Sequence, residues 1–127
     1  MKGISLIVET LAQQAEVEVL WLYGSRANDN HHQNSDYDLA VAFNSLTSNR
    51  FQSIDDLHYA LNKIDDIKES ISIVDINQVP TPLAISIIDE GRVLHCQSDL
   101  RLRQEQQRVW SLWEEYKYQH ASNRKEL

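Results

Sequence analysis

Two aspartates separated by one residue, Asp36 and Asp38, open an otherwise apolar stretch and have the types and spacing to bind a metal ion. Residues i and i+2 of a β-strand point to the same face, so a strand at this position would bring both carboxylates together. Two such carboxylates repel each other, whereas a divalent cation between them removes the repulsion and gains hard oxygen ligands. A D-x-D pair alone is also typical of a solvated strand start, so it becomes informative only together with other residues.

A Gly-Ser turn, Gly24-Ser25, follows the apolar segment VEVLWLY and is joined to the two aspartates by a polar loop. Backbone N–H groups and a hydroxyl in such a turn can approach phosphate oxygens, and Arg26 could clamp the same phosphate. If the strands on either side of the loop pair as antiparallel neighbours, we expect the turn to lie beside the aspartates. An ordinary turn that ends a strand is the alternative interpretation.

A third carboxylate, Asp75, lies within the apolar segment ISIVDIN, where an unpaired charge is costly to bury. If this segment is a strand beside the one that starts at Asp36, we expect Asp75 to join Asp36 and Asp38 at one metal site. The alternative is an aspartate at a strand end that reaches solvent or caps a turn. From average residue usage, G-S and D-x-D at this spacing should occur by chance in roughly one of several hundred chains of this size.

The segments around these residues alternate between helical and strand patterns, which predicts an α+β fold with helices packed on a small sheet. We expect residues 1–127 to form a single domain with a long C-terminal helix and a polar tail, HASNRKEL. The expected elements are a helix over about 4–15, strands over 17–23 and 36–43, a helix from about 54 with Ser53 as its N-cap, a strand over about 71–76, a short helix opened by Thr81-Pro82 and closed by Gly91, a short strand RVLH, and a helix over about 98–120 capped by Ser98 or Asp99.

The composition narrows the classes of function. The formal net charge is -7 and no basic stripe is present, which argues against a protein that grips a nucleic-acid backbone. The one cysteine, Cys96, excludes an internal disulfide and fits a reducing compartment. No segment approaches the roughly 18 apolar residues of a membrane span, so we expect a cytoplasmic location.

The combined pattern resembles the minimal nucleotidyltransferases of the DNA polymerase β superfamily. Their signature is G-S and D-x-D on a strand-turn-strand unit with an aspartate on a later strand, and the matching residues here are Gly24, Ser25, Asp36, Asp38 and Asp75. The segments YGSRA and SDYDLAV are most similar to those of the antitoxins of MntA–HepT (MNT/HEPN) toxin–antitoxin pairs. One departure is the loop NDNHHQN, because many relatives have glycine soon after the G-S-R-A segment.

The resemblance implies a polymerase β-like fold with a small mixed sheet, and an enzyme that uses Mg²⁺, with two ions expected, and ATP. Asp36, Asp38 and Asp75 would hold the metal, while Gly24, Ser25 and Arg26 would bind the nucleotide. The implied reaction is transfer of AMP to a tyrosine hydroxyl of a cognate HEPN-domain RNase toxin, which neutralises the toxin. Transfer to a small hydroxylated molecule, or neutralisation by binding alone, are the alternatives.

Overall fold

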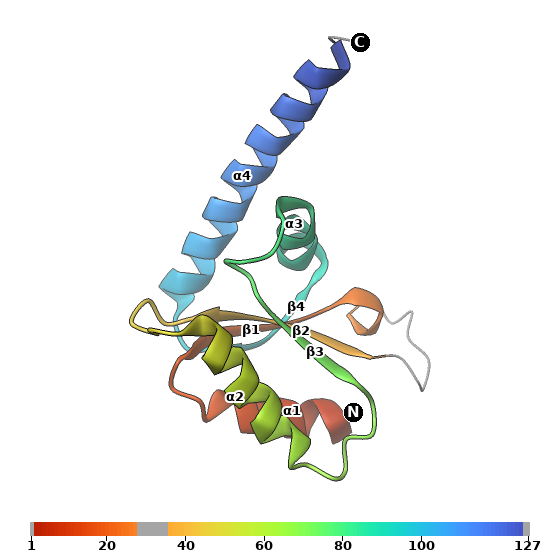
Figure 1. The fold of residues 1–127 in the computed structure, drawn as a ribbon, viewed down its shortest axis with the longest axis vertical. Coiled ribbons are helices and arrows are strands. Elements are labelled where there is room, and N and C mark those ends of the chain that lie inside the picture. The colour runs from red at the N-terminus through yellow and green to blue at the C-terminus, as the bar shows by residue number, and fades with distance from the viewer. Residues whose placement is uncertain (1, 28–35, 126–127) are drawn as a thin grey trace.

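The computed structural model describes residues 2–27 and 36–125, which form a four-stranded sheet with helices on both faces (Figure 1). The loop NDNHHQN lies entirely within residues 28–35, which are outside the described part of the chain. The observed order confirms the α+β prediction. The elements are α1 Lys2–Ala12, β1 Val17–Tyr23, a 3-10 turn Gly24–Arg26, β2 Tyr37–Phe43, α2 Arg50–Asn62, β3 Ile71–Asp75, α3 Thr81–Glu90, β4 Arg92–Cys96 and α4 Asp99–Lys125.

The sheet is mixed, with the strand order β3-β2-β1-β4. Strand β1 pairs antiparallel with both β2 and β4, whereas β2 and β3 run parallel. The antiparallel β1–β2 pair is the one expected for neighbouring strands joined by a single loop. Its register places Tyr23 opposite Asp38, so the end of β1 meets the start of β2.

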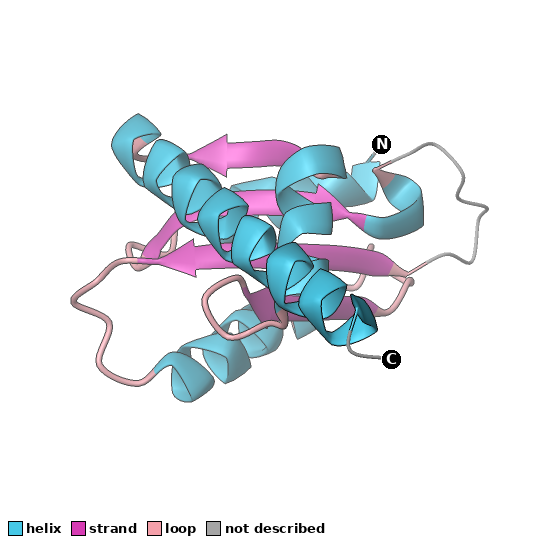
Figure 2. Ribbon diagram, turned by 90° about the horizontal axis from the view of Figure 1, so that it is seen from above, coloured by secondary structure: helices cyan, strands magenta, loops and turns pink. Residues whose placement is uncertain are grey.

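Both faces of the sheet are covered, which explains why β1 is apolar along almost its whole length. One face, with Leu20, Leu22 and Leu39, packs against α1 and α2. The opposite face, with Trp21 and Ala40, packs against α3 and the first turns of α4. Figure 2 shows α4 crossing over this second face of the sheet.

Helix α2 begins earlier than expected, and the prediction of Ser53 as its N-cap was wrong. The helix starts at Arg50, and the side chain of Asn49 accepts a hydrogen bond from the backbone N–H of Gln52 at 3.1 Å. Ser53 lies inside the helix and is buried. The apolar spacing used for the prediction begins only at Ile54, because the first turn of α2 carries mostly polar residues.

Helix α4 begins as predicted, because the Ser98 hydroxyl accepts a hydrogen bond from the backbone N–H of Arg101 at 3.1 Å. It ends at Lys125, beyond the expected limit, and its last turns run past α3 and away from the sheet (Figure 1). Val109 is fully buried, whereas the side chain of Trp110 is 49% exposed and that of Tyr118 is 74% exposed. Neither α4 nor any other described helix combines the length and apolar character needed to cross a membrane.

Candidate active site

The Gly-Ser turn and the second aspartate of the D-x-D pair are in direct contact at one edge of the sheet. Gly24 has a φ of 73°, a backbone conformation that residues with a Cβ rarely adopt. A Cβ on Gly24 would lie 2.5 Å from Oδ2 of Asp38, so only glycine lets the carboxylate approach this closely. The expected proximity of turn and carboxylate is therefore confirmed for Gly24 and Asp38.

The two aspartates differ in their surroundings. Asp36 precedes β2 and is exposed, whereas Asp38 is half-buried between neighbouring strands. Burial raises the pKa of Asp38 above its ordinary value, and the negative charge of Asp36 raises it further. The pKa of the Tyr23 hydroxyl is also raised, first by burial and then by the charge of Asp38. Negative charge therefore accumulates here at a cost that a cation would offset.

The turn and the acid pair fit a metal-bound nucleotide in two respects. The absence of a Cβ at Gly24 lets Oδ2 of Asp38 lie against the backbone of the turn, and carboxylate oxygens are the ligands that Mg²⁺ prefers. The acids fall short in number, however. Among the residues that the structure describes, no group of three or more His, Cys, Asp or Glu side chains is arranged to hold a metal ion.

Asp75 does not join the acid pair, so the expected convergence of three carboxylates was wrong. In the parallel β2–β3 pair, Asp75 lies opposite Val41, and the residue opposite Asp38 is Ser72. Ser72 and Asp75 are three positions apart along β3, which is about 10 Å at the usual rise per residue. Val41 also faces the α1–α2 side of the sheet, whereas Asp38 shares the α3–α4 side with Ala40.

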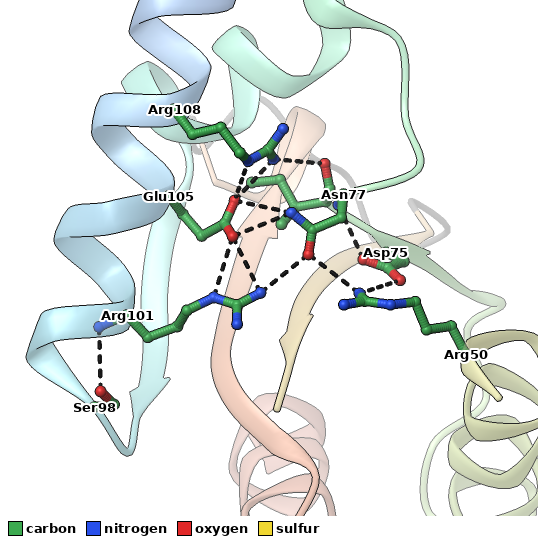
Figure 3. A network of polar contacts seen from close by, with 8 residues as sticks. Arg50, Asp75, Asn77, Ser98, Arg101, Glu105 and Arg108 are labelled. Carbon is green, nitrogen blue, oxygen red and sulfur yellow. Dashed lines mark hydrogen bonds and ion pairs between the residues drawn. The ribbon is translucent and has the colours of Figure 1, made fainter. Parts of the chain in front are cut away.

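Asp75 instead stabilises the end of β3 through a network that ties together three parts of the fold (Figure 3). One carboxylate oxygen accepts a hydrogen bond from the backbone N–H of Asn77 at 2.9 Å. The other accepts a hydrogen bond from Nη1 of Arg50, at the start of α2, also at 2.9 Å. Of the alternatives from the sequence, an aspartate at a strand end that caps a turn describes this arrangement better than one that reaches solvent.

The same network continues into α4 through Asn77, as Figure 3 shows. The Asn77 amide nitrogen donates to the Glu105 carboxylate, and its oxygen accepts from Arg101 at 3.0 Å. Glu105 is 4% exposed and forms ion pairs with Arg101 at 3.1 Å and Arg108 at 2.7 Å. A buried carboxylate with this many partners fixes the root of α4 against the end of β3. Nothing in the sequence pattern pointed to Glu105, because Arg101 and Arg108 are ordinary neighbours on its own helix and its partner Asn77 comes from a distant segment.

Arg26 does not point toward the acid pair, which contradicts its expected position as a phosphate clamp. It is 4% exposed, and its guanidinium carbon lies 4.1 Å from the centroid of the Tyr37 ring. Its Nη2 atom lies 3.9 Å from Oε1 of Glu69. Tyr37 belongs to the core on the α1–α2 side of the sheet, opposite to Asp38. Arg26 therefore supports the turn from the α1–α2 side of the sheet.

Two residues that the sequence prediction did not include flank Asp38. Tyr23 is its register partner on β1, and Ser72 is its register partner on β3. Register partners in neighbouring strands point to the same face, so both side chains share the surface of the acid pair. Ser72 could have been identified from the sequence by assuming that β2 and β3 are parallel and begin at the same edge of the sheet, because Ser72 lies near the start of ISIVD as Asp38 lies near the start of β2.

The comparisons with known proteins agree with this fold. Residues 6–100 match the family model described as "Polymerase beta, Nucleotidyltransferase". A comparison with curated proteins gave no match.

Solved structures with the same fold cover nearly the whole chain. A crystal structure of a toxin-antitoxin with AMP-PNP aligns with a TM-score of 0.70 and 18% identity, covering 98% of this chain and 95% of that chain. The toxin-antitoxin MntA-HepT aligns with a TM-score of 0.67 and 17% identity, over 98% and 96% of the two chains. A tri-AMPylated Shewanella oneidensis HEPN toxin in complex with MNT antitoxin aligns with a TM-score of 0.68 and 16% identity, over 98% and 95%.

Proposed function

The chain belongs to the polymerase β nucleotidyltransferase family, and from this premise we propose that it transfers AMP from ATP to a protein hydroxyl. The observation that carries the proposal is the contact between the Gly24 turn and the Asp38 carboxylate. It brings a backbone turn open to phosphate oxygens next to an acid pair suited to a cation. The acidic net charge of -7 favours a protein acceptor over a nucleic-acid primer.

Each residue of the turn and the acid pair has a separate proposed role. Asp36 and Asp38 would hold Mg²⁺, which would neutralise triphosphate charge and polarise the phosphoryl oxygens. The Gly24 backbone and the Ser25 hydroxyl bind phosphate oxygens beside that position. Arg26 is a positioning residue, since its stacking on Tyr37 fixes the turn from the opposite side of the sheet.

The proposed reaction is a displacement at the α-phosphorus of ATP. The acceptor hydroxyl oxygen forms a bond to the α-phosphorus, and the bond from this phosphorus to the bridging oxygen breaks. Pyrophosphate leaves with the bonding electron pair, and the hydroxyl proton passes to solvent. The contribution of the protein is to hold the triphosphate and the acceptor in line, because positioning and charge stabilisation supply most of the catalysis of phosphoryl-type transfers.

We take the acceptor to be a tyrosine of a cognate HEPN-domain RNase toxin. Support comes from the solved structures of the same fold, which include an MNT antitoxin in complex with a tri-AMPylated HEPN toxin. An AMP group on a tyrosine near an RNA-cleaving site adds bulk and negative charge, which repels the RNA backbone. This effect gives a physical route to neutralisation of the toxin.

The test is intact-mass spectrometry of the toxin after co-expression with this chain or with its Asp36→Asn, Asp38→Asn double variant. We expect mass increments of AMP with the unmodified chain, and their loss with the variant. A Ser48→Asn variant, which changes an exposed loop residue after β2, is the control for co-expression. A neutralised toxin whose mass never changes would refute the proposal.

Neutralisation by binding alone is the second candidate function, and one observation favours it. The described residues place two carboxylates, and not three, at the start of β2 and β3. A toxin that stays neutralised but unmodified when Asp36 and Asp38 are both asparagine would establish this function. No comparable observation favours a small hydroxylated acceptor, and a screen of such compounds with labelled ATP would detect that activity.

A further inference from the structure

Asp38 has two neighbours in the sheet, and only one of them leaves room for a further metal ligand. On β1 the neighbour is Tyr23, whose half-buried ring packs with the core on the α3–α4 side. On β3 the neighbour is Ser72, which is exposed at the edge of the sheet. Adjacent strands lie about 4.8 Å apart, so a side chain at position 72 can share a cation with Asp38.

The chemistry at position 72 decides how much negative charge surrounds such a cation. A serine hydroxyl is neutral and a weak ligand for Mg²⁺, whereas carboxylates are the ligands this ion prefers. With serine there, the described site offers the charge of Asp36 and Asp38 alone. The number of charged ligands tunes the affinity of a site for hard divalent cations.

We propose that Ser72 is the residue that limits metal binding at this site, so that the chain holds Mg²⁺ and ATP through two carboxylates and binds them weakly. The inference rests on the proposed function for the identity of the ligand, Mg·ATP. It deepens that function by assigning the strength of the site to one residue on β3. An aspartate at position 72 would complete a cluster of three acids around the cation.

The local structure tolerates this change, which makes the proposal testable. Ser72 faces solvent on an edge strand, so a larger side chain does not require the core to repack. Without metal, a carboxylate at position 72 adds repulsion against Asp38 and lowers the stability of the fold. With metal, the same carboxylate becomes a ligand, so the stabilisation by Mg²⁺ should increase.

The experiment compares Ser72→Asp with the matched control Ser48→Asp, which adds the same charge to an exposed loop beyond the opposite end of β2. Mn²⁺ affinity is measured by electron paramagnetic resonance, and Mg·ATP affinity by calorimetry. We expect Ser72→Asp to bind both at least about tenfold more tightly than the unmodified chain. We expect Ser48→Asp to stay within about twofold, since solvent and salt screen a distant charge.

Melting temperatures with and without Mg²⁺ give a readout independent of activity. Ser72→Asp should melt below the unmodified chain in the absence of metal and gain more from added Mg²⁺ than Ser48→Asp does. Ser72→Ala should bind Mn²⁺ within about twofold of the unmodified chain, because a weak hydroxyl ligand contributes little. Equal metal affinities for Ser72→Asp and Ser48→Asp, or a tenfold loss in Ser72→Ala, would overturn the proposal.

The proposal for Ser72 and the proposed transfer of AMP to the toxin can be refuted independently of each other. If Ser72→Asp tightens metal binding while no variant modifies the toxin, the assignment of Ser72 stands and the proposed acceptor is wrong. If the unmodified chain adds AMP to the toxin and Ser72→Asp does not tighten metal binding, the assignment of Ser72 is wrong and the proposed function stands.

Discussion

Replacement of Gly24 by alanine tests the central contact of the site. The structure gives two costs for this change. The φ of 73° places alanine in the left-handed region, which costs about 1 kcal/mol. The new Cβ would also lie 2.5 Å from Oδ2 of Asp38, so the carboxylate must move aside.

The combined effect on stability should be about 2 kcal/mol, because displacing the flexible end of the Asp38 side chain adds roughly 1 kcal/mol to the backbone strain. For a chain of this size that corresponds to a fall of about 7 °C in melting temperature. The change should also weaken nucleotide binding. A carboxylate turned away from the turn loses its proposed place beside the triphosphate, so we expect Mg·ATP affinity to fall at least about tenfold.

The assay is a double-mutant cycle, read by thermal denaturation and by calorimetry with Mg·ATP. In an Asp38→Ala background the oxygen that the new Cβ would meet is absent, so Gly24→Ala should cost only the backbone strain of about 1 kcal/mol. The coupling energy between the two positions should then be about 1 kcal/mol. An equal cost in both backgrounds, or unchanged Mg·ATP binding by Gly24→Ala, would refute the reasoning from this contact.

Three further predictions concern Asp38, Asp75 and the start of α2. Burial and the charge of Asp36 raise the pKa of Asp38, so the folded chain binds a proton at this carboxylate more readily than the unfolded chain does. The stability of the fold therefore falls as the pH rises from the unfolded-state pKa of Asp38 through its folded-state pKa. Asp38→Asn should therefore raise the melting temperature of the metal-free chain at neutral pH by about 2 °C, with solvent screening taken into account. The gain should disappear in thermal scans near pH 3, because the Asp38 carboxyl is then protonated and neutral like the amide. Asp75→Ala should lower the free energy of unfolding by about 2 kcal/mol in urea denaturation, because Arg50 and the Asn77 N–H lose their acceptor. Mg·ATP affinity should stay within about twofold. A large loss of affinity would show that Asp75 does contribute to the site. Asn49→Ala should cost about 1 kcal/mol by the same method, and a larger cost for Ser53→Ala would contradict the observed start of α2.

Much of the fold could be predicted from the sequence because its signals are local. Apolar residues at helical or strand spacing give the order of elements, and they reveal the buried character of β1 without any knowledge of its neighbours. The pairing of β1 with β2 also follows, since one loop joins them and sequential strands tend to be neighbours. The contact of Gly24 with Asp38 is a direct result of that antiparallel pair, so the proximity of the glycine turn to Asp38 could be predicted.

The sequence by itself therefore determined the elements, the first strand pair and the acids that begin β2. Only the tertiary structure decided which residue of β3 lies opposite Asp38. The register of this parallel pair depends on how α2, which connects β2 to β3, packs on the face of the sheet, and no local signal in the sequence specifies it. A strand reverses its faces with every residue, so Asp75, three positions along, points to the other side of the sheet and pairs with Arg50. The same packing brings Ser72 to the acid pair.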